Sequence, residues 1–244
     1  MTSSPLWYRM RGLMMFLIVF LSFYLAYGIS NASGQSTLPT AWQLAGDNGI
    51  ERFRLVFAIA ALFPIATFWL RCWGAAYLRA STVWAADASA SRLIVAGPFR
   101  YLRNPLYLGN LLMLPWIALL MPPSGIPILV VAMLLFVTAL SRHESAVLHD
   151  RFGPEYDAYA AKLPALFPHA PVPASSDAPT PNWGEGVRSE ILTLFFAALA
   201  IAIAIAPRLL VNHWLWGVVL LGYLLQRFLA RRDPQEGEAD APQE

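Results

Sequence analysis

Six long apolar segments constrain this chain more than any other feature of its sequence. Four of them contain no charged residue, and the other two carry a charged residue only near one end. A helix needs about 20 mostly apolar residues to cross a hydrocarbon core about 30 Å thick. Lipid offers no partner to a free backbone amide, so such segments must be helical. The pattern predicts an all-α, polytopic membrane helical bundle of about six transmembrane helices, at 13–29, 55–78, 105–121, 126–140, 191–206 and 214–229.

The basic residues indicate how this bundle is oriented. If six spans alternate in direction, 14 of the 17 lysines and arginines fall on one side, and only Arg52, Arg54 and Arg208 fall on the other. Arg71 is counted with the larger group because it lies near the end of the second span. Cytoplasmic loops carry an excess of Lys and Arg. We therefore expect a multi-pass integral membrane protein with both termini and both long loops in the cytoplasm.

The N-terminal segment has a second interpretation. Two arginines, an apolar stretch and a short Ser-Asn-Ala sequence at 30–32 also resemble a cleavable signal peptide. The apolar stretch of 17 residues is longer than a usual signal core, which favours a retained first span.

Composition excludes several other classes of protein. Charged residues make up 13% of the chain, against about 25% in soluble domains, and 57% of residues are hydrophobic. An ordinary soluble globule and a disordered chain are both excluded. The net charge of +2 is too small for a nucleic-acid surface, so no nucleic-acid partner is expected. His143 and His149 are six positions apart, whereas the zincin motif places two histidines four apart, so no metal site is predicted.

The first informative motif lies between the second and third predicted spans. The Gly-Pro pair at 97–98 predicts a turn, and Pro105 is well suited to the first turn of a helix. Arg103 and Asn104 then lie at the cytoplasmic mouth of the third span, with Tyr107 on the same helical face. A helix N-terminus favours an anion, so a carboxylate or phosphate could be held here. On composition alone, arginines that only meet lipid headgroups are the simpler explanation.

The second motif follows the fourth span. The segment 121–125, Met-Pro-Pro-Ser-Gly, predicts a tight turn, so spans three and four form a helical hairpin and bring the two motifs to the same end. Glu144 then lies beside Asn104 and Tyr107, where it could meet a cationic group of a ligand or simply pair with Arg142 or Arg103. Large apolar residues after it recur at helical spacing and predict an amphipathic helix on the membrane surface: Leu148, Phe152, Tyr156 and Tyr159.

Together the two motifs resemble a known family. Residues 97–109 (GPFRYLRNPLYLG) closely resemble the Gly-Pro-Tyr…Arg-His-Pro-x-Tyr-x-Gly signature of the isoprenylcysteine carboxyl methyltransferases and their phospholipid methyltransferase relatives. Glu144 and the Phe-Gly-x-x-Tyr-x-x-Tyr run that begins at Phe152 resemble the second signature of that family. The resemblance covers roughly residues 53–168.

The resemblance implies a pocket for S-adenosyl-L-methionine, formed without a Rossmann domain and closed by the cytoplasmic segment. The residues that would line it are Leu93, Ile94, Phe99, Asn104, Pro105, Leu106, Tyr107 and Glu144. Chemically, Arg103, Asn104 and the helix amides suit the carboxylate of the cofactor, and Glu144 suits its ammonium. An aromatic ring could face the sulfonium. Arg142 could meet an acidic acceptor, and no catalytic residue is assigned.

Two departures from the signatures bear on activity. Asn104 stands where the family usually has His, so a proton-transfer role there is doubtful, and Ser145 stands where a second Glu is usual. The sequence predicts an S-adenosylmethionine-dependent methyltransferase of the membrane that acts on a lipophilic or lipid-linked acceptor, through a carboxylate or an amine. The alternatives are a membrane reductase of the sterol-reductase type that uses NADPH, and a non-catalytic membrane protein that retains the core.

The chain divides into five predicted regions. In order, they are an N-terminal helix and external loop (1–52), the methyltransferase-like core (53–168), a Pro-rich cytoplasmic linker (169–186), a C-terminal two-helix pair (187–232) and an acidic tail (233–244). The C-terminal pair is predicted to serve packing and anchoring.

Overall fold

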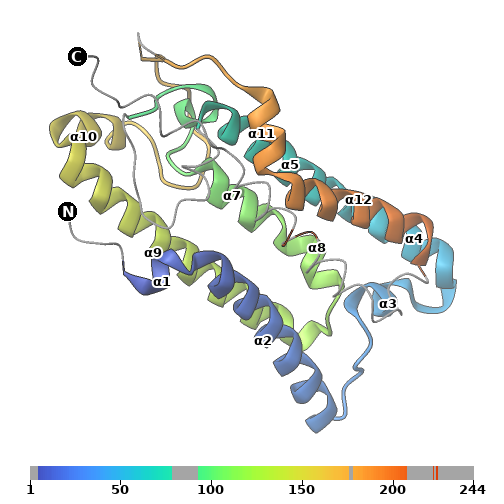
Figure 1. The fold of residues 1–244 in the computed structure, drawn as a ribbon. Helices are drawn as coiled ribbons and strands as arrows, with labels where there is room; N and C mark the ends of the chain where they lie inside the picture. Colours follow the sequence, from blue (N-terminus) through green and yellow to red (C-terminus); the bar gives the residue numbers. More distant parts are fainter. Residues whose placement is uncertain (1–4, 79–92, 176–177, 208–221, 223, 225–244) are drawn as a thin grey trace.

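The computed structural model describes residues 5–78, 93–175, 178–207, 222 and 224. All regular structure in these ranges is helical and no strand occurs in them, which confirms the predicted all-α class. The long helices form two groups (Figure 1). One group pairs α2 (Arg11–Ala32) with α9 (Ile126–Phe152), and the other packs α12 (Ile191–Ile205) on α4 (Gly49–Ala60) and α5 (Leu62–Tyr77).

Shorter elements join and separate the two groups. Between them lie α7 (Pro105–Leu112) and α8 (Leu114–Leu119), which contact α5 and α9 (Figure 1). The remaining short helices are α1 (Leu6–Arg9), α3 (Thr40–Ala45), η1 (Gly46–Asn48), η2 (Gly97–Arg100), η3 (Pro123–Gly125), α10 (Pro154–Ala160) and α11 (Trp183–Ser189). Figure 1 places α1, α10 and α11 toward one end of the bundle and α3 at the other.

The number of membrane spans is the main correction to the sequence prediction. Within the described residues, three helical segments are long and apolar enough to cross a membrane: Arg11–Ala32, Gly49–Tyr77 and Pro123–Phe152. They correspond to the first, second and fourth predicted spans. A bent pair, α11 with α12, raises the count to four if it is one broken span. Within the described residues, the structure therefore supports three or four spans rather than the five that the sequence predicts there.

Proline explains why the third predicted span is short. Its helical part, Pro105–Leu119, is shorter than a membrane crossing requires and is divided into α7 and α8 at Met113. Pro115 follows at the second position of α8, and a proline there has no amide to donate and clashes with the carbonyl four residues earlier. The fifth prediction, 191–206, coincides with α12, but α11 meets it at 68°. The sixth, 214–229, lies outside the described residues except for Gly222 and Leu224.

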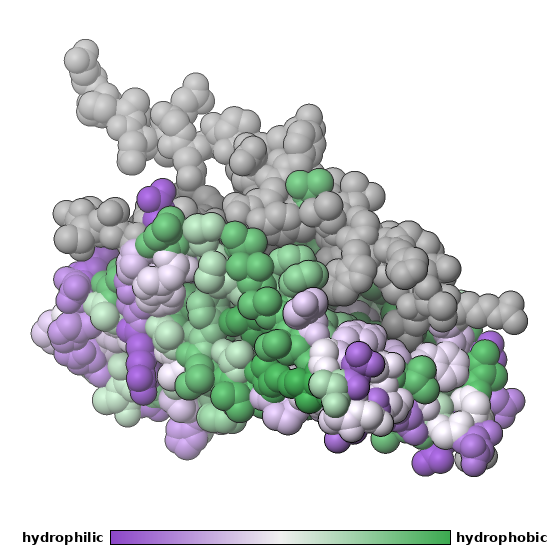
Figure 2. Space-filling view, turned by 90° about the horizontal axis from the view of Figure 1, so that it is seen from below, coloured by the Kyte–Doolittle hydropathy of each residue, from purple (hydrophilic) through white to green (hydrophobic). Residues whose placement is uncertain are grey.

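The surface agrees with a membrane location. Large apolar side chains are exposed on several long helices, for example Leu135 on α9 and Leu62 and Trp69 on α5. Figure 2 shows hydrophobic residues gathered across the middle of one face, with hydrophilic residues toward its two ends. Exposed apolar area of this extent fits contact with lipid rather than water.

The predicted hairpin between the third and fourth predicted spans is confirmed. After α8 the chain turns through η3, where the Gly125 amide donates to the Pro122 carbonyl at 3.1 Å, and α9 begins at once. A Cβ on Gly125 would lie 2.5 Å from the Cβ of Ala26, so only glycine lets α2 approach this turn. The hairpin and α2 together place the start of α7 beside the C-terminal half of α9.

The proline-rich segment after α10 is extended, and it lies along the segment that leads into α7. The amides of His169, Val172 and Ser175 donate to carbonyls of residues 101, 100 and 95, at 2.8 to 3.2 Å. Further along, the amide of Asn182 donates to the carbonyl of Ala76 at 2.7 Å. Residues 164–175 therefore act as a strap that fixes the position of the first motif.

A buried ionic network joins α5 and the start of α12 to α7. Arg71 donates through Nε and Nη2 to both carboxylate oxygens of Glu190, at 2.6 and 2.8 Å, and through Nη1 to Asn110 Oδ1 at 2.8 Å. Thr193 donates to Glu190 Oε2 at 2.7 Å. Arg71 was counted with the cytoplasmic basic residues because it lies near the end of the second predicted span. The structure places it inside α5, with a buried carboxylate as its partner.

Candidate functional site

The first motif is shaped by one glycine and one proline. Gly97 has a φ of +53°, and a Cβ on it would collide with the ring of Tyr77, so the turn requires glycine. Pro105 is the first residue of α7, as predicted, since a proline at that position loses no helical hydrogen bond. The result is that residues 103–107 run across the C-terminal half of α9.

Three successive contacts join this segment to one stretch of α9. Arg103 Nη1 donates to Ser145 Oγ at 3.4 Å, and Asn104 Nδ2 donates to Ser141 Oγ at 2.9 Å. One turn further along α7, the Tyr107 hydroxyl donates to Glu144 Oε1 at 2.6 Å. The two motifs that the sequence placed at the same end of the hairpin are therefore in direct contact.

The surroundings of Glu144 are unusual for a carboxylate. Its Oε1 accepts hydroxyl hydrogen bonds from both Tyr8 and Tyr107, each at 2.6 Å. Neither Arg103 nor Arg142 forms an ion pair with it, nor does any other cation in the part of the chain that the structure describes. Burial, and then the negative charge of Glu144, raise the pKa of Tyr8 well above its ordinary value, so its hydroxyl stays protonated as a donor.

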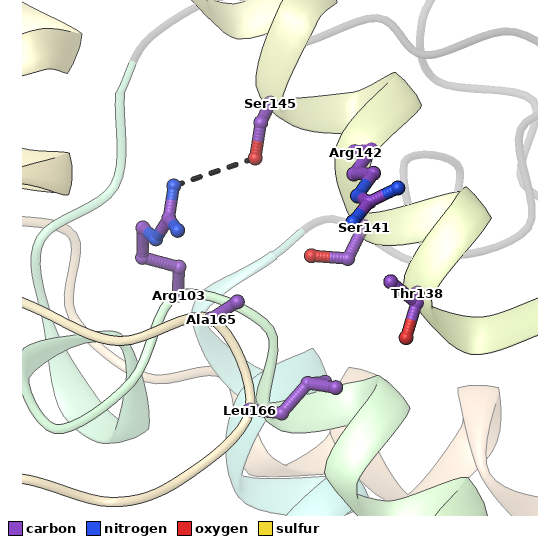
Figure 3. Close-up of a pocket in the computed structure, with 7 residues that line it drawn as sticks. All are labelled: Arg103, Thr138, Ser141, Arg142, Ser145, Ala165 and Leu166. Atoms are coloured by element: carbon purple, nitrogen blue, oxygen red, sulfur yellow. Dashed lines mark hydrogen bonds between the residues drawn. The ribbon is translucent and has the colours of Figure 1, made fainter. Parts of the chain in front are cut away.

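A cavity of about 350 Å³ opens beside these contacts. Figure 3 shows its lining: Thr138, Ser141, Arg142 and Ser145 from one face of α9, Arg103 opposite them, and Ala165 and Leu166 from the strap. Volumes of about 300–1,000 Å³ are usual for small-molecule sites. Its charged side chains are two arginines, so the cavity suits an anionic group.

Arg103 has a donor to spare at this cavity. Its Nη1 also donates to the Tyr156 hydroxyl at 3.0 Å, but its Nε is buried without a hydrogen-bond partner among the described residues. A buried donor without a partner costs about 1–3 kcal/mol, which an anion in the cavity would offset.

The backbone amides of Arg103 and Asn104, in contrast, already have hydrogen-bond partners. The amide of Arg103 donates to the Pro164 carbonyl at 3.1 Å, and the amide of Asn104 donates to the Ala165 carbonyl at 3.0 Å. The Asn104 side chain also donates to Ala165, at 3.2 Å. The strap thus occupies the backbone amides of Arg103 and Asn104, which directly precede α7, and the Arg103 guanidinium keeps a donor for an anion.

Several predicted pocket residues lie away from this cavity. Pro105 and Leu106 pack against Gly74 of α5, and the Leu106 carbonyl accepts from Arg71. Leu93 packs with Tyr156 and the residues around it. Ile94 and Phe99 are partly exposed, and neither of them lines the cavity. Asn104, Tyr107 and Glu144 lie beside the cavity but are not among its lining residues either.

The sequence reasoning missed Tyr8. It lies in α1, is 2% exposed, and reaches a residue 136 positions further along the chain. A tyrosine among N-terminal residues before an apolar span carries no sign of such a contact, because membrane-interface tyrosines are common. Only the packing of α2 on α9 brings it there.

Comparison with protein-family models identifies the core of the chain. Residues 55–155 match the phospholipid methyltransferase family, and they include α5, α7, α9 and the contacts of Arg103, Asn104 and Tyr107 with α9. No similar curated protein and no similar solved structure was found. Among the alternatives that the sequence left open, the match favours the methyltransferase.

Proteins of this family are S-adenosylmethionine-dependent methyltransferases of membranes, and the family implies a lipid acceptor. The described helices are consistent with a multi-pass integral membrane protein. Residues 55–155 are therefore similar to the phospholipid methyltransferase family, the integral-membrane methyltransferases related to the isoprenylcysteine carboxyl methyltransferases.

Proposed function

We propose that this protein transfers a methyl group to an anionic, lipophilic acceptor at the cavity between α9 and the strap. The observation that carries the proposal is Glu144: a carboxylate held by two hydroxyls, with no cation paired to it in the described residues. A charge without a partner is costly away from water, so the site favours a ligand that brings a positive charge.

The residues present fit the amino-acid end of S-adenosylmethionine. Glu144 would accept from its ammonium through Oε2, and Arg103, with its spare Nε donor, would hold its carboxylate. Asn104 is committed to Ser141 and the strap, so it orients α7 and takes no part in proton transfer. Tyr107 contributes by holding Glu144 in place through its hydroxyl hydrogen bond. The other predicted pocket residues, Leu93, Ile94, Phe99, Pro105 and Leu106, are proposed to contact the rest of the cofactor.

Methyl transfer requires little of the protein beyond aligning the acceptor with the methyl group of the cofactor. The cofactor supplies an electrophilic methyl group on a sulfonium, which is already a good leaving group. The chain has to bring the acceptor into line with that group and exclude water, an effect of positioning. Arg142 is exposed at the rim of the cavity and would meet the anionic part of the acceptor. A carboxylate acceptor is nucleophilic at neutral pH, whereas an amine must first lose a proton.

The site is proposed to face the cytoplasm. Arg9, Arg100, Arg151 and Arg188 belong to elements at the same end of the bundle as the site (Figure 1). Arg52 and Arg54 lie at the start of α4, at the opposite end. This distribution supports the orientation that the positive-inside rule predicts.

Calorimetric titration with S-adenosylhomocysteine tests the proposal. The full chain in lipid nanodiscs should bind this ligand and not NADPH. Glu144→Gln should weaken binding about 10- to 100-fold, because it removes one partner of a charge pair. Glu155→Gln, at an exposed residue of α10, is the matched control and should bind like the wild type. Absence of binding, or binding of NADPH instead, would overturn the proposal.

A second assay separates the two acceptor chemistries. Methyl-tritiated S-adenosylmethionine is incubated with the protein and a total lipid extract, and the organic phase is counted. A methyl ester releases volatile methanol on mild alkaline treatment, whereas an N-methyl group stays on its nitrogen and is not volatilised. Release of the label would identify a carboxylate acceptor, and retention would identify an amine.

A further inference from the structure

Tyr8 stands apart from the rest of the site because it comes from outside the segment that matches the family. It lies in α1, ahead of the first span, whereas the match begins at residue 55. Its neighbours in that helix are more exposed, Leu6 at 69% and Trp7 at 36%, but Tyr8 is 2% exposed. The side chain of Tyr8 therefore turns inward onto the site.

The two tyrosines bind the same oxygen of Glu144. Tyr8 and Tyr107 both donate to Oε1 at 2.6 Å, from opposite parts of the chain. A carboxylate oxygen offers two lone-pair positions, so two donors saturate it. No residue that the structure describes donates to Oε2. The two oxygens are thus made unequal: one is held by the protein, and the other is left for a ligand.

Ring contacts hold Tyr8 in this position. The Tyr8 and His143 ring centroids are 4.6 Å apart, and Trp7 adds an edge contact to His143 at 5.4 Å. The Arg11 guanidinium lies 4.7 Å from the centre of the Tyr8 ring. These ring contacts hold α1 against α9 and do not involve the Tyr8 hydroxyl.

We infer that Tyr8 is a positioning residue for the cofactor site: its hydroxyl and that of Tyr107 fix the rotation of the Glu144 carboxylate, so that Oε2 alone faces the ligand ammonium. The inference rests on the proposed function. With one donor, the carboxylate can turn and exchange its two oxygens, whereas two donors on one oxygen hold it in a single orientation. The N-terminal helix thereby completes a site whose other parts lie in residues 55–155.

The Tyr8 hydroxyl can be removed without removing the ring. Tyr8→Phe keeps the ring that packs on His143 and under Arg11, and Tyr24→Phe, at a residue of α2 that is 71% exposed, is the matched control. Each full-length protein in nanodiscs is titrated with two ligands. S-adenosylhomocysteine has the amino-acid end that Glu144 would hold, and 5′-methylthioadenosine has the adenosine and the thioether but no amino-acid end.

The expected result is selective. Tyr8→Phe should weaken S-adenosylhomocysteine about 3- to 10-fold, the effect of one hydrogen bond, and leave 5′-methylthioadenosine within about twofold. Tyr24→Phe should change neither. In a Glu144→Gln background, Tyr8→Phe should have no further effect on S-adenosylhomocysteine, since the two residues act on one interaction.

Three results would overturn the inference. Tyr8→Phe could bind S-adenosylhomocysteine as the wild type does, or it could lose both ligands equally, which would indicate a general structural role. An undiminished effect of Tyr8→Phe in the Glu144→Gln background would show that it does not act through Glu144. A wild-type protein that binds neither ligand would instead overturn the proposed function, and this inference with it.

Discussion

Two carboxylates in this protein have opposite surroundings. Glu190 is fully buried, and Arg71 holds both of its oxygens, while Thr193 adds a third donor. Glu144 is half-buried in the C-terminal half of α9, and two neutral hydroxyls hold one of its oxygens. The first carboxylate has its counter-charge within the protein, and the second has none among the described residues.

The difference separates a structural role from a binding role. An ion pair with all its donors satisfied fixes helices relative to one another, and here it ties α5 to the start of α12 and to α7. A carboxylate without a cation is costly to keep unless a ligand supplies the charge. Polar residues within a membrane protein mark function by default, and the partner decides which function.

The largest effect should follow from breaking the structural pair. Glu190→Ala leaves the Arg71 guanidinium buried with half of its donors unpaired, and removal of one partner of a buried pair costs about 3–5 kcal/mol. Thermal unfolding in detergent, followed by tryptophan fluorescence, should show a large fall in the melting temperature. Glu155→Ala, at an exposed position on α10, should leave it unchanged. A melting temperature for Glu190→Ala equal to that of the wild type would contradict the structural role of Glu190.

The second prediction concerns Glu144, where a substitution should weaken ligand binding but leave the stability of the ligand-free protein almost unchanged. Glu144→Gln keeps an acceptor for the Tyr8 and Tyr107 hydroxyls, so the free energy of unfolding without ligand should change by less than about 1 kcal/mol. A ligand at 100 times its Kd stabilises a protein by about 2.7 kcal/mol. S-adenosylhomocysteine should therefore raise the melting temperature of the wild type and raise that of Glu144→Gln much less at the same concentration, since a 10- to 100-fold weaker Kd leaves only about 0.4–1.4 kcal/mol of stabilisation. Strong destabilisation without ligand would instead assign Glu144 a structural role.

Local sequence signals were sufficient for much of this arrangement. The Gly-Pro turn at 97–98, the helix start at Pro105 and the hairpin at 121–125 were predicted because glycine and proline act on the backbone where they stand. The same signals predicted that Asn104 and Tyr107 meet the cytoplasmic half of α9. The span count was wrong because hydropathy alone does not register that Pro115 divides a helix, or that α11 and α12 meet at an angle.

The long-range partners could not be predicted. Tyr8 and Glu144 are 136 positions apart, and Arg71 and Glu190 are 119 apart. Each pair forms because helix packing brings its members together, and one sequence holds no record of that packing. A signal was nevertheless present for the second pair: Arg71 interrupts an apolar run, and Glu190 directly precedes another. A charge inside such a run calls for a buried partner more than for lipid headgroups.

The smallest effect should come from a methyl group that disturbs the structural pair without removing it. A Cβ on Gly109 would lie 2.5 Å from Arg71 Cγ and 2.9 Å from its Cδ, near the base of the side chain, so Gly109→Ala must displace the arginine. Overpacking of this kind costs about 1–3 kcal/mol. Gly28→Ala in α2, where nothing lies within 4 Å of the new Cβ, is the matched control and should be neutral or slightly stabilising.

Both variants are unfolded thermally and titrated with S-adenosylhomocysteine. If the two carboxylates belong to independent regions, Gly109→Ala lowers the melting temperature but leaves the Kd within about twofold, because sites without shared partners combine additively. A weaker Kd would show that Arg71, through its hydrogen bond to the Leu106 carbonyl, also holds Tyr107 in register with Glu144.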